Sequence, residues 1–142
     1  MLIPAVLAKL HRVRVTEANL DYVGSITIDS DLLKASGLMP YQKVHVNSVE
    51  NGTHWETYIL EGPAGSGKIC LNGPPAHFFK PGHIVIIVGY GQLTPEELKT
   101  HVPTVVFVDE KNKVTKIQKH ASIPLGATGP SKAVSTSKKK GK

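Results

Sequence analysis

The stretch His11-Arg-Val-Arg-Val-Thr16 places valines at positions 13 and 15 between polar residues. A period of two is the pattern of a strand with one buried face. The same alternating or β-branched pattern recurs in six further segments: Tyr22–Asp29, Lys43–Val49, His54–Leu60, Lys68–Leu71, His83–Val88 and Thr104–Val108. Short strands at this close spacing predict a mainly β protein, a small closed barrel rather than a parallel α/β sheet.

The helical segments predicted between these strands are short. Residues 29–37 predict one helix, with Asp29 or Ser30 as its cap and Gly37 at its end. Thr94-Pro-Glu-Glu97 predicts another, because it has a capping residue and a proline at the first helical position.

The chain of 142 residues is long enough for one domain, which we place at residues 1–123. Residues 124–142 are mainly Gly, Ala, Ser, Thr, Pro and Lys, which predicts a disordered tail. Five lysines of the tail account for most of the net charge of +6, and without them residues 1–128 carry +1. The barrel is therefore not expected to bind nucleic acid. The tail is interpreted as a solvated end, with a weak RNA or membrane contact as the less favoured alternative.

The cellular compartment is predicted from cysteine content and hydropathy. Cys70 is the single cysteine and cannot form an internal disulfide, which favours a reducing compartment. The apolar N-terminus lacks a preceding basic region, and no stretch approaches the roughly twenty apolar residues of a membrane span. We expect a cytoplasmic protein that does not enter the membrane.

Two kinds of site are disfavoured by spacing. The seven histidines are scattered and no paired-cysteine or His-Glu-x-x-His pattern occurs, so we expect no metal site. Gly62-Pro-Ala-Gly-Ser-Gly-Lys68 has the glycine spacing of a phosphate-binding loop, but Ile69 stands where that loop needs a hydroxyl. A loop that connects two strands is the preferred interpretation.

A series of short motifs carries a family resemblance across residues 1 to about 118. They are Lys9-Leu-His-Arg12, Val15-Thr16, Tyr22-Val-Gly-Ser25, Ile28-Asp29, Asn51-Gly52, Thr57-Tyr58, Gly65-Ser-Gly67, Leu71-Asn-Gly73, Ala76-His77, Pro81-Gly82 and Ile84-Val-Ile-Ile87. In this order the chain resembles the bacterial aspartate 1-decarboxylase family. The resemblance implies a double-psi β barrel that assembles as a homotetramer, with active sites between neighbouring subunits.

The resemblance also implies self-cleavage into residues 1–24 and 25–142. Ser25 attacks the carbonyl of Gly24, and the resulting ester eliminates to dehydroalanine, which hydrolyses to a covalent pyruvoyl cofactor. Thr57 matches the residue that donates to the oxyanion. We expect Gly24 to permit backbone torsions that are uncommon for other residues. Whether an accessory maturation factor takes part is left open.

The pyruvoyl group implied by the resemblance acts as an electron sink when L-aspartate loses its α-carboxylate, giving β-alanine for pantothenate and coenzyme A. Tyr58 matches the proton donor. Asn72 and Gly73 match the loop that holds the pyruvoyl group and the substrate, and Lys9 matches a cation for a substrate carboxylate. The structural alternatives are an outward strand residue for Thr57, a core aromatic for Tyr58, a turn for Asn72-Gly73 and a solvated strand end for Lys9.

Two departures from the family pattern fall in the expected substrate site. His54 stands where the family carries an arginine that binds a substrate carboxylate, and an imidazole is charged only below a pKa of about 6.5. Pro74 and Pro75 stand where the family has small alanines, and Pro75 lacks an N–H. These differences leave two alternatives to aspartate decarboxylation: a decarboxylase of a related amino acid, and a non-catalytic barrel that binds a small molecule.

Overall fold

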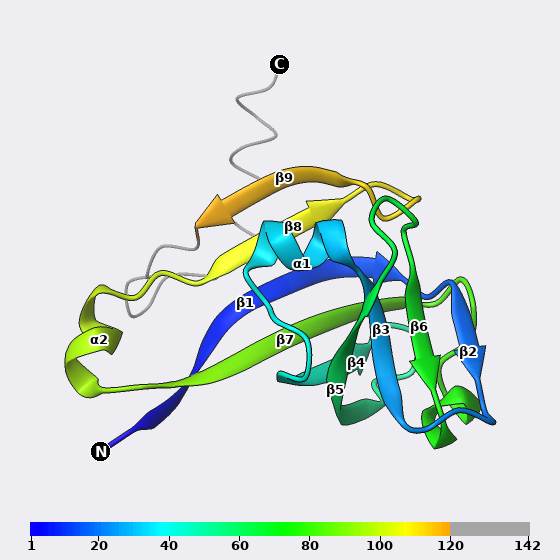
Figure 1. The fold of residues 1–142 in the computed structure, drawn as a ribbon, viewed down its shortest axis with the longest axis horizontal. Coiled ribbons are helices and arrows are strands. Elements are labelled where there is room, and N and C mark those ends of the chain that lie inside the picture. Colours follow the sequence, from blue (N-terminus) through cyan, green and yellow to red (C-terminus); the bar gives the residue numbers. More distant parts are fainter. Residues whose placement is uncertain (120–142) are drawn as a thin grey trace.

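The strands of the protein form one mixed, strongly curved sheet (Figure 1). This computed structural model describes residues 1–119, so the predicted tail at 124–142 and the domain limit at 123 lie outside the described residues. The sheet order is β2-β6-β3-β5-β4-β7-β1-β8-β9. The strands are β1 (Ile3–Arg14), β2 (Glu17–Asn19), β3 (Ser25–Asp29), β4 (Lys43–Ser48), β5 (His54–Gly62), β6 (Ile69–Asn72), β7 (Ile84–Leu93), β8 (Thr104–Val108) and β9 (Val114–Lys119). The predicted mainly β, barrel-like class is confirmed.

Aliphatic side chains from all parts of the sheet fill the interior. The largest fully buried side chains are Phe79, Leu10, Ile26, Ile28, Leu32, Ile59, Ile69, Leu71, Ile87, Val13, Val15 and Val44. Each side chain of this size stabilises the fold by about 1.5–3 kcal/mol when it leaves water. Trp55 packs against this core with its ring centroid 6.2 Å from that of Phe79. The core therefore reaches the first half of β5, where the site described below begins.

The predicted helix at residues 29–37 is confirmed as α1 (Ser30–Ser36), which is capped by Asp29 and ends at Gly37 with φ of 81°. The Asp29 carboxylate is buried and also accepts hydrogen bonds from the backbone N–H groups of Gly65, at 3.0 Å, and Gly67, at 2.7 Å. These amides are thus satisfied within the protein, and the loop joins β5 to β6. The interpretation as a strand-connecting loop is confirmed.

The remaining helices are short. The second predicted helix is α2 (Pro95–Thr100), in which Thr94 and Glu97 form a reciprocal capping box. A 3₁₀ turn, η1 (Pro74–His77), follows β6 and was not predicted. In the described part of the chain, none of the helices has the length and apolar character that a membrane span needs.

Strand β5 has different neighbours along its two halves. Its first half pairs antiparallel with β4, from Asn47 opposite His54 to Lys43 opposite Tyr58. Its second half pairs parallel with β3, from Ile26 opposite Ile59 onward. Within the described sheet, residues 54–58 therefore have a strand partner on the β4 side only. Their other edge is available to border a pocket.

Candidate active site

A pocket of about 500 Å³ lies beside the first half of β5, within the size range of small-molecule sites. Its lining comes from the turn before β3, from β5 and from the segment around η1. The lining residues are Gly24, Thr53, His54, Trp55, Glu56, Thr57, Tyr58, Pro74, Pro75, Phe78 and Phe79. Six of the ten residues predicted for the site are among them, so the fold brings together positions that lie up to 51 residues apart in the sequence.

Ser25 lies at the first position of β3, next to the pocket-lining Gly24, and is 1% exposed. Its hydroxyl donates a hydrogen bond to the carbonyl oxygen of Val23 at 3.3 Å. Its Oγ also accepts a hydrogen bond from Nδ2 of Asn72 at 3.2 Å. The antiparallel register places Asn72 directly opposite Ser25, so the two side chains are held together by the sheet itself.

The side chain of Asn72 is oriented by a further neighbour, Cys70. The Cys70 thiol donates to Oδ1 of Asn72 at 3.2 Å, while Nδ2 of Asn72 also reaches Oγ1 of Thr27 at 3.4 Å. Burial raises the pKa of the Cys70 thiol, which keeps it a protonated donor at neutral pH. The sequence analysis assigned Cys70 no role in the site. Its spacing of two from Asn72 along a strand, which places both on one face, was the available signal.

Gly73 supports the turn that precedes Ser25. Its φ of 89° and ψ of −156° fall in a region that is essentially restricted to glycine. A Cβ at this position would lie 2.9 Å from Cα of Gly24 and 3.2 Å from the carbonyl oxygen of Tyr22. Gly24 itself is not among the residues with positive φ, and a Cβ there would meet only the Asn72 carbonyl oxygen at 3.9 Å. The backbone of Gly24 is thus not in the left-handed region, and it is the close approach of Gly24 to residue 73 that requires glycine at 73.

Thr57 and Tyr58 lie on β5 at the pocket edge, opposite Val44 and Lys43 of β4. Adjacent residues of a strand point to opposite faces, and both border the pocket because it runs along the strand edge. Tyr58 is 37% exposed. Across residues 1–119 neither hydroxyl forms a hydrogen bond within the protein, so both remain available to a ligand.

Comparison with known proteins decides the family. The sequence model described as aspartate decarboxylase matches residues 1–115. The chain belongs to the aspartate decarboxylase family. Because the relatives named next also carry the name aspartate 1-decarboxylase, the enzyme class predicted from the sequence is confirmed.

Several curated relatives of the aspartate decarboxylase family are similar over most of the chain. A protein of Dehalococcoides mccartyi is 52% identical over 111 residues, which are 78% of this chain and 90% of that protein. One of Salinibacter ruber is 58% identical over 109 residues, or 77% of this chain and 75% of that protein. One of Acetivibrio thermocellus is 52% identical over 126 residues, or 87% of this chain and all of that protein. Each is named aspartate 1-decarboxylase.

Pro74 and Pro75 form the start of η1 in this aspartate decarboxylase. Proline suits the first positions of a helical turn, where a backbone N–H has no partner inside the turn. Pro74 is exposed and Pro75 is buried, and both line the pocket. The first N–H of the segment is that of Ala76, which donates to the carbonyl oxygen of Gly73 at 3.0 Å. Neither proline can therefore donate a backbone hydrogen bond to a substrate.

Lys9 is the predicted site residue that the single chain places elsewhere. It lies in β1, opposite Val88 of β7 and Val105 of β8, and it is not among the pocket-lining residues. Its neighbours Ala8 and Leu10 are buried in the core, so the side chain of Lys9 points to the outer face. Within one chain, Lys9 and the pocket are thus separated by strands β4 and β7.

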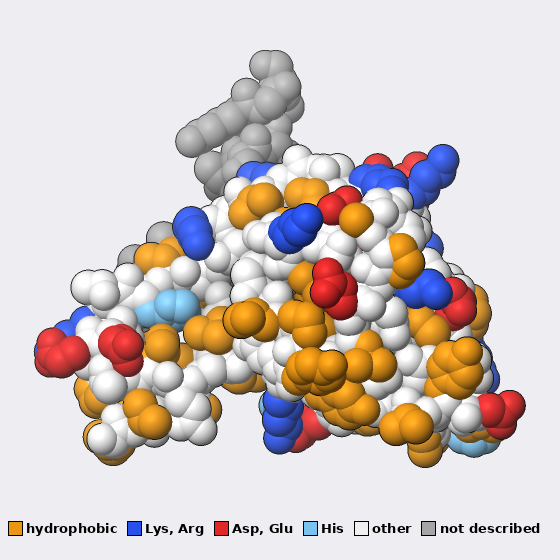
Figure 2. All heavy atoms as spheres, viewed as in Figure 1, with side chains coloured by type: hydrophobic (Ala, Val, Ile, Leu, Met, Phe, Trp, Pro, Cys, Tyr) orange, Lys and Arg blue, Asp and Glu red, His pale blue; other side chains and the backbone are white. Residues whose placement is uncertain are grey.

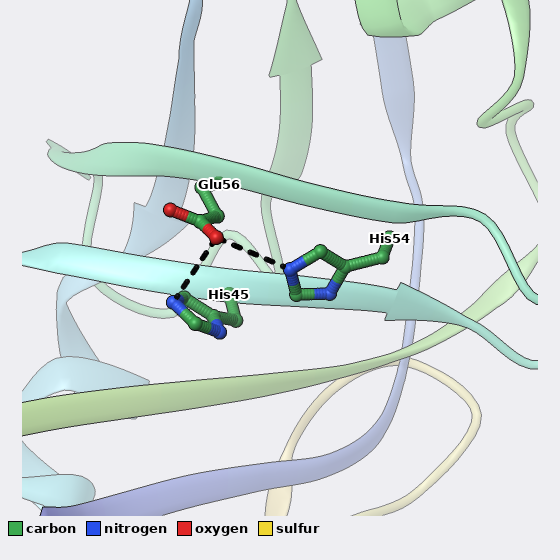
Figure 3. Close-up of side chains that lie close together, drawn as sticks. All are labelled: His45, His54 and Glu56. Carbon is green, nitrogen blue, oxygen red and sulfur yellow. Dashed lines mark hydrogen bonds and ion pairs between the residues drawn. The ribbon is translucent and has the colours of Figure 1, made fainter.

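His54, in place of the family's arginine, is engaged by neighbouring side chains at the pocket edge (Figure 3). Its Nδ1 lies 2.6 Å from Oδ1 of Asn47, and its Nε2 lies 3.5 Å from Oε2 of Glu56. The Lys43 ammonium lies 2.8 Å from the other carboxylate oxygen, Oε1 of Glu56. This ammonium, and to a lesser extent the His54 ring, holds the pKa of Glu56 below its ordinary value. The pocket edge therefore carries a carboxylate beside the imidazole.

Proposed function

We propose that this aspartate 1-decarboxylase cuts itself between Gly24 and Ser25, converts Ser25 to a pyruvoyl group and uses it to convert L-aspartate to β-alanine and CO₂. The observation that carries the proposal is the buried Ser25 hydroxyl, which Asn72 and the Val23 carbonyl hold one residue from a pocket.

The cutting reaction uses groups that lie around the turn. The Ser25 oxygen attacks the carbonyl carbon of Gly24, the bond from that carbon to the Ser25 nitrogen breaks, and an ester forms. The Thr57 hydroxyl, which has no partner among the described residues, is our candidate donor to the negative charge that develops on the Gly24 oxygen. Asn72 positions the attacking oxygen, and Gly73 lets the turn approach closely. Elimination then breaks the bond between Cβ and Oγ of residue 25 and releases the Gly24 carboxylate, and water converts the resulting dehydroalanine to the pyruvoyl group with release of ammonia.

The surroundings of Ser25 fit a pyruvoyl group. Nδ2 of Asn72 lies within hydrogen-bond distance of the Ser25 side chain, and an amide N–H is suited to donate to a ketone oxygen, which would stand on Cα of residue 25 in place of the serine nitrogen. When bound, a pyruvoyl group withdraws the electrons released by loss of a carboxylate. Tyr58 is assigned as the group that returns a proton to the substrate carbon, because its exposed phenol borders the pocket and a phenol O–H can donate.

The substrate is assigned to the remaining pocket residues. His54 is our candidate for a carboxylate of aspartate, since it lies on the lining and donates when it is protonated. Asn72 lies opposite Ser25 and Gly73 packs on Gly24, whereas Pro74 and Pro75 line the pocket without offering an N–H. These assignments leave the second cation, Lys9, to be supplied from outside the chain.

We therefore propose a homotetramer in which a neighbouring subunit contributes Lys9. Large apolar side chains are exposed near the pocket, among them Tyr22 at 63%, Val23 at 80% and Phe78 at 58%. Figure 2 shows hydrophobic side chains gathered on the lower part of the face that it presents. Clusters of this kind commonly mark subunit contacts. Co-assembly of Lys9→Ala chains with Ser25→Ala chains tests the sharing, because only mixed oligomers regain activity if one chain supplies Lys9 and the other supplies the pyruvoyl group.

The cellular role completes the proposal. β-Alanine is a precursor of pantothenate and coenzyme A, and we propose that the enzyme supplies it in the cytoplasm. The single cysteine, Cys70, is a buried free thiol, which suits a reducing compartment.

Intact mass of the purified full chain tests the central step. We expect two fragments, residues 1–24 and residues 25–142 with a pyruvoyl terminus, and one uncut mass for Ser25→Ala. Ser30→Ala removes another buried serine nearby and is expected to be cut as the original chain is. A chain that stays whole on prolonged warming and in cell extract contradicts the proposal, whereas cutting in extract alone adds a maturation factor to it. A cut chain that releases CO₂ from another amino acid but not from aspartate contradicts the substrate.

A further inference from the structure

Three metal-ligating side chains gather on the outer face of β4 and β5 at the edge of the pocket (Figure 3). The antiparallel register places His45 directly opposite Glu56, and Asn47 directly opposite His54. Residues two apart on a strand share a face, so all four side chains lie on the same side of the sheet. The sequence disfavoured a metal site because the histidines are scattered, but the hairpin brings two of them together with a carboxylate.

The hydrogen bond from His54 to Asn47 fixes which ring nitrogen is free. Oδ1 of Asn47 can only accept, so at 2.6 Å the Nδ1 of His54 must carry the proton. In a neutral imidazole Nε2 is then a bare lone pair, and it lies 3.5 Å from Oε2 of Glu56. The Nε2 of His45 lies 3.7 Å from the same oxygen. A lone pair that faces a carboxylate oxygen is unfavourable unless a proton or a metal cation lies between them.

The distances are close to those of a metal centre. Zinc binds imidazole nitrogen and carboxylate oxygen at about 2.0–2.2 Å, so tetrahedral ligands lie about 3.4 Å apart. The two nitrogen-to-oxygen distances exceed that value by only a few tenths of an ångström, and all three ligand atoms lie within 4.8 Å of one another. The side chains of His54 and Glu56 are about half exposed, so small rotations can complete the approach.

The second oxygen of Glu56 is engaged by Lys43 at 2.8 Å. This contact places a positive charge nearby, which weakens cation binding. Lys43 contacts Oε1 whereas the histidines face Oε2, and its side chain is 69% exposed, so it can turn into solvent. The arrangement leaves Oε2 free as a ligand.

We propose that Nε2 of His45, Nε2 of His54 and Oε2 of Glu56 bind one divalent transition-metal ion of the zinc class, with water completing its coordination. Two imidazoles and one carboxylate suit Zn²⁺, Co²⁺ and Ni²⁺ and leave positions open. Asn47 orients the His54 ring, because its Oδ1 accepts from Nδ1, and a ligand histidine commonly donates its other N–H to an oxygen in this way. The three ligands are in place in the uncut chain, so the site does not depend on self-cleavage. Because His54 is also our candidate donor to a substrate carboxylate and Nδ1 is engaged by Asn47, metal binding and that carboxylate contact exclude one another at Nε2.

Titration with Zn²⁺ by calorimetry and with Co²⁺ by visible absorption tests the site, on the full chain without a histidine tag. We expect one ion per chain and the absorption of a Co²⁺ ion with fewer than six ligands. His45→Ala, His54→Ala and Glu56→Gln should each weaken binding at least tenfold, and Asn47→Ala by roughly tenfold. His77→Ala removes an exposed histidine outside the cluster and should change nothing.

Two results would overturn the proposal: no stoichiometric binding by the full chain, or binding that survives in both histidine variants of the cluster. The same titration on Ser25→Ala chains separates this proposal from the enzymatic one, since that variant should bind zinc normally although it stays uncut. Circular dichroism of each variant checks that a loss of binding does not come from a loss of fold.

Discussion

Replacement of Gly73 by alanine tests how closely the turn before Ser25 must be packed. The added Cβ would lie 2.9 Å from Cα of Gly24, whereas carbon atoms pack best at about 3.5–4.0 Å, so the turn must move by at least about 0.6 Å. The backbone torsions of Gly73 add a cost of about 1–3 kcal/mol for any residue with a side chain. A misplacement near 1 Å can slow a reaction by about 100-fold. We therefore expect Gly73→Ala to be destabilised and to cut itself about 100-fold more slowly.

Gly82→Ala is the matched control, because Gly82 has a similar φ of 91° but open space where its Cβ would lie. It should share the loss of stability that comes from a left-handed backbone and keep its rate of cutting. Thermal unfolding measures the first quantity, and intact mass over time measures the second. Equal cutting rates in both variants would refute the reasoning, since the contact with Gly24 would then have no role in the reaction.

Substitutions at three further positions address the site and the fold. His54→Arg should lower the Michaelis constant for aspartate several-fold, because a guanidinium stays charged and binds a carboxylate through two N–H groups. Steady-state kinetics with a chelator present measure this constant. An unchanged Michaelis constant would contradict the prediction. Cys70→Val removes the donor to Asn72 and should slow cutting up to about tenfold, whereas Cys70→Ser should restore it, as intact mass will show. Hydrogen bonds from Thr94 hold the pKa of Glu97 below its ordinary value. The charge of the Glu97 carboxylate therefore stabilises the fold fully above about pH 4.3, the ordinary pKa of a glutamate. This stabilisation is lost as the pH falls through the lowered pKa. Glu97→Gln should therefore unfold more easily than the original chain in urea at pH 7 and equally at low pH.

The fold could be predicted where side-chain pattern and burial agree. The bounds of β8 (Thr104–Val108) match the prediction, because an apolar run lies between a proline and an aspartate. The segment Tyr22–Asp29 was predicted as one strand, but β3 begins only at Ser25. Pattern alone could not show that residues 22–24 leave the sheet to pack on Gly73.

Elements that depend on their neighbours were missed. Strand β9 (Val114–Lys119) is almost wholly exposed and is ordered by pairing with β8 rather than by burial. Strand β1 begins at Ile3, eight residues before the predicted start. Residues 3–7 have no partner in β8 and none of them is fully buried, so they show no clear alternation of buried and exposed positions. Strand β2 has only three residues, which is too few for a periodic signal.

The candidate site, like the fold, could be predicted only in part from the sequence. The pocket brings together Gly24, Thr57 and Tyr58, which the family resemblance had named from the sequence. The link between Cys70 and Asn72 and the cluster around His45 were not predicted, because each depends on strand register. Register is set by the whole sheet, and a shift of one residue would move every one of these side chains to the opposite face.

The position of Lys9 separates the two reactions that we propose. In the sheet order, β1 is three strands from β5, which corresponds to about 14 Å at the usual spacing between strands, and Lys9 lies on the outer face. The groups assigned to cutting, from Ser25 to Asn72, all lie within one chain, whereas the cation assigned to substrate binding does not. Cutting should therefore tolerate loss of Lys9, and decarboxylation should not. A Lys9→Ala chain that is cut normally but turns over aspartate poorly is the behaviour that this geometry requires.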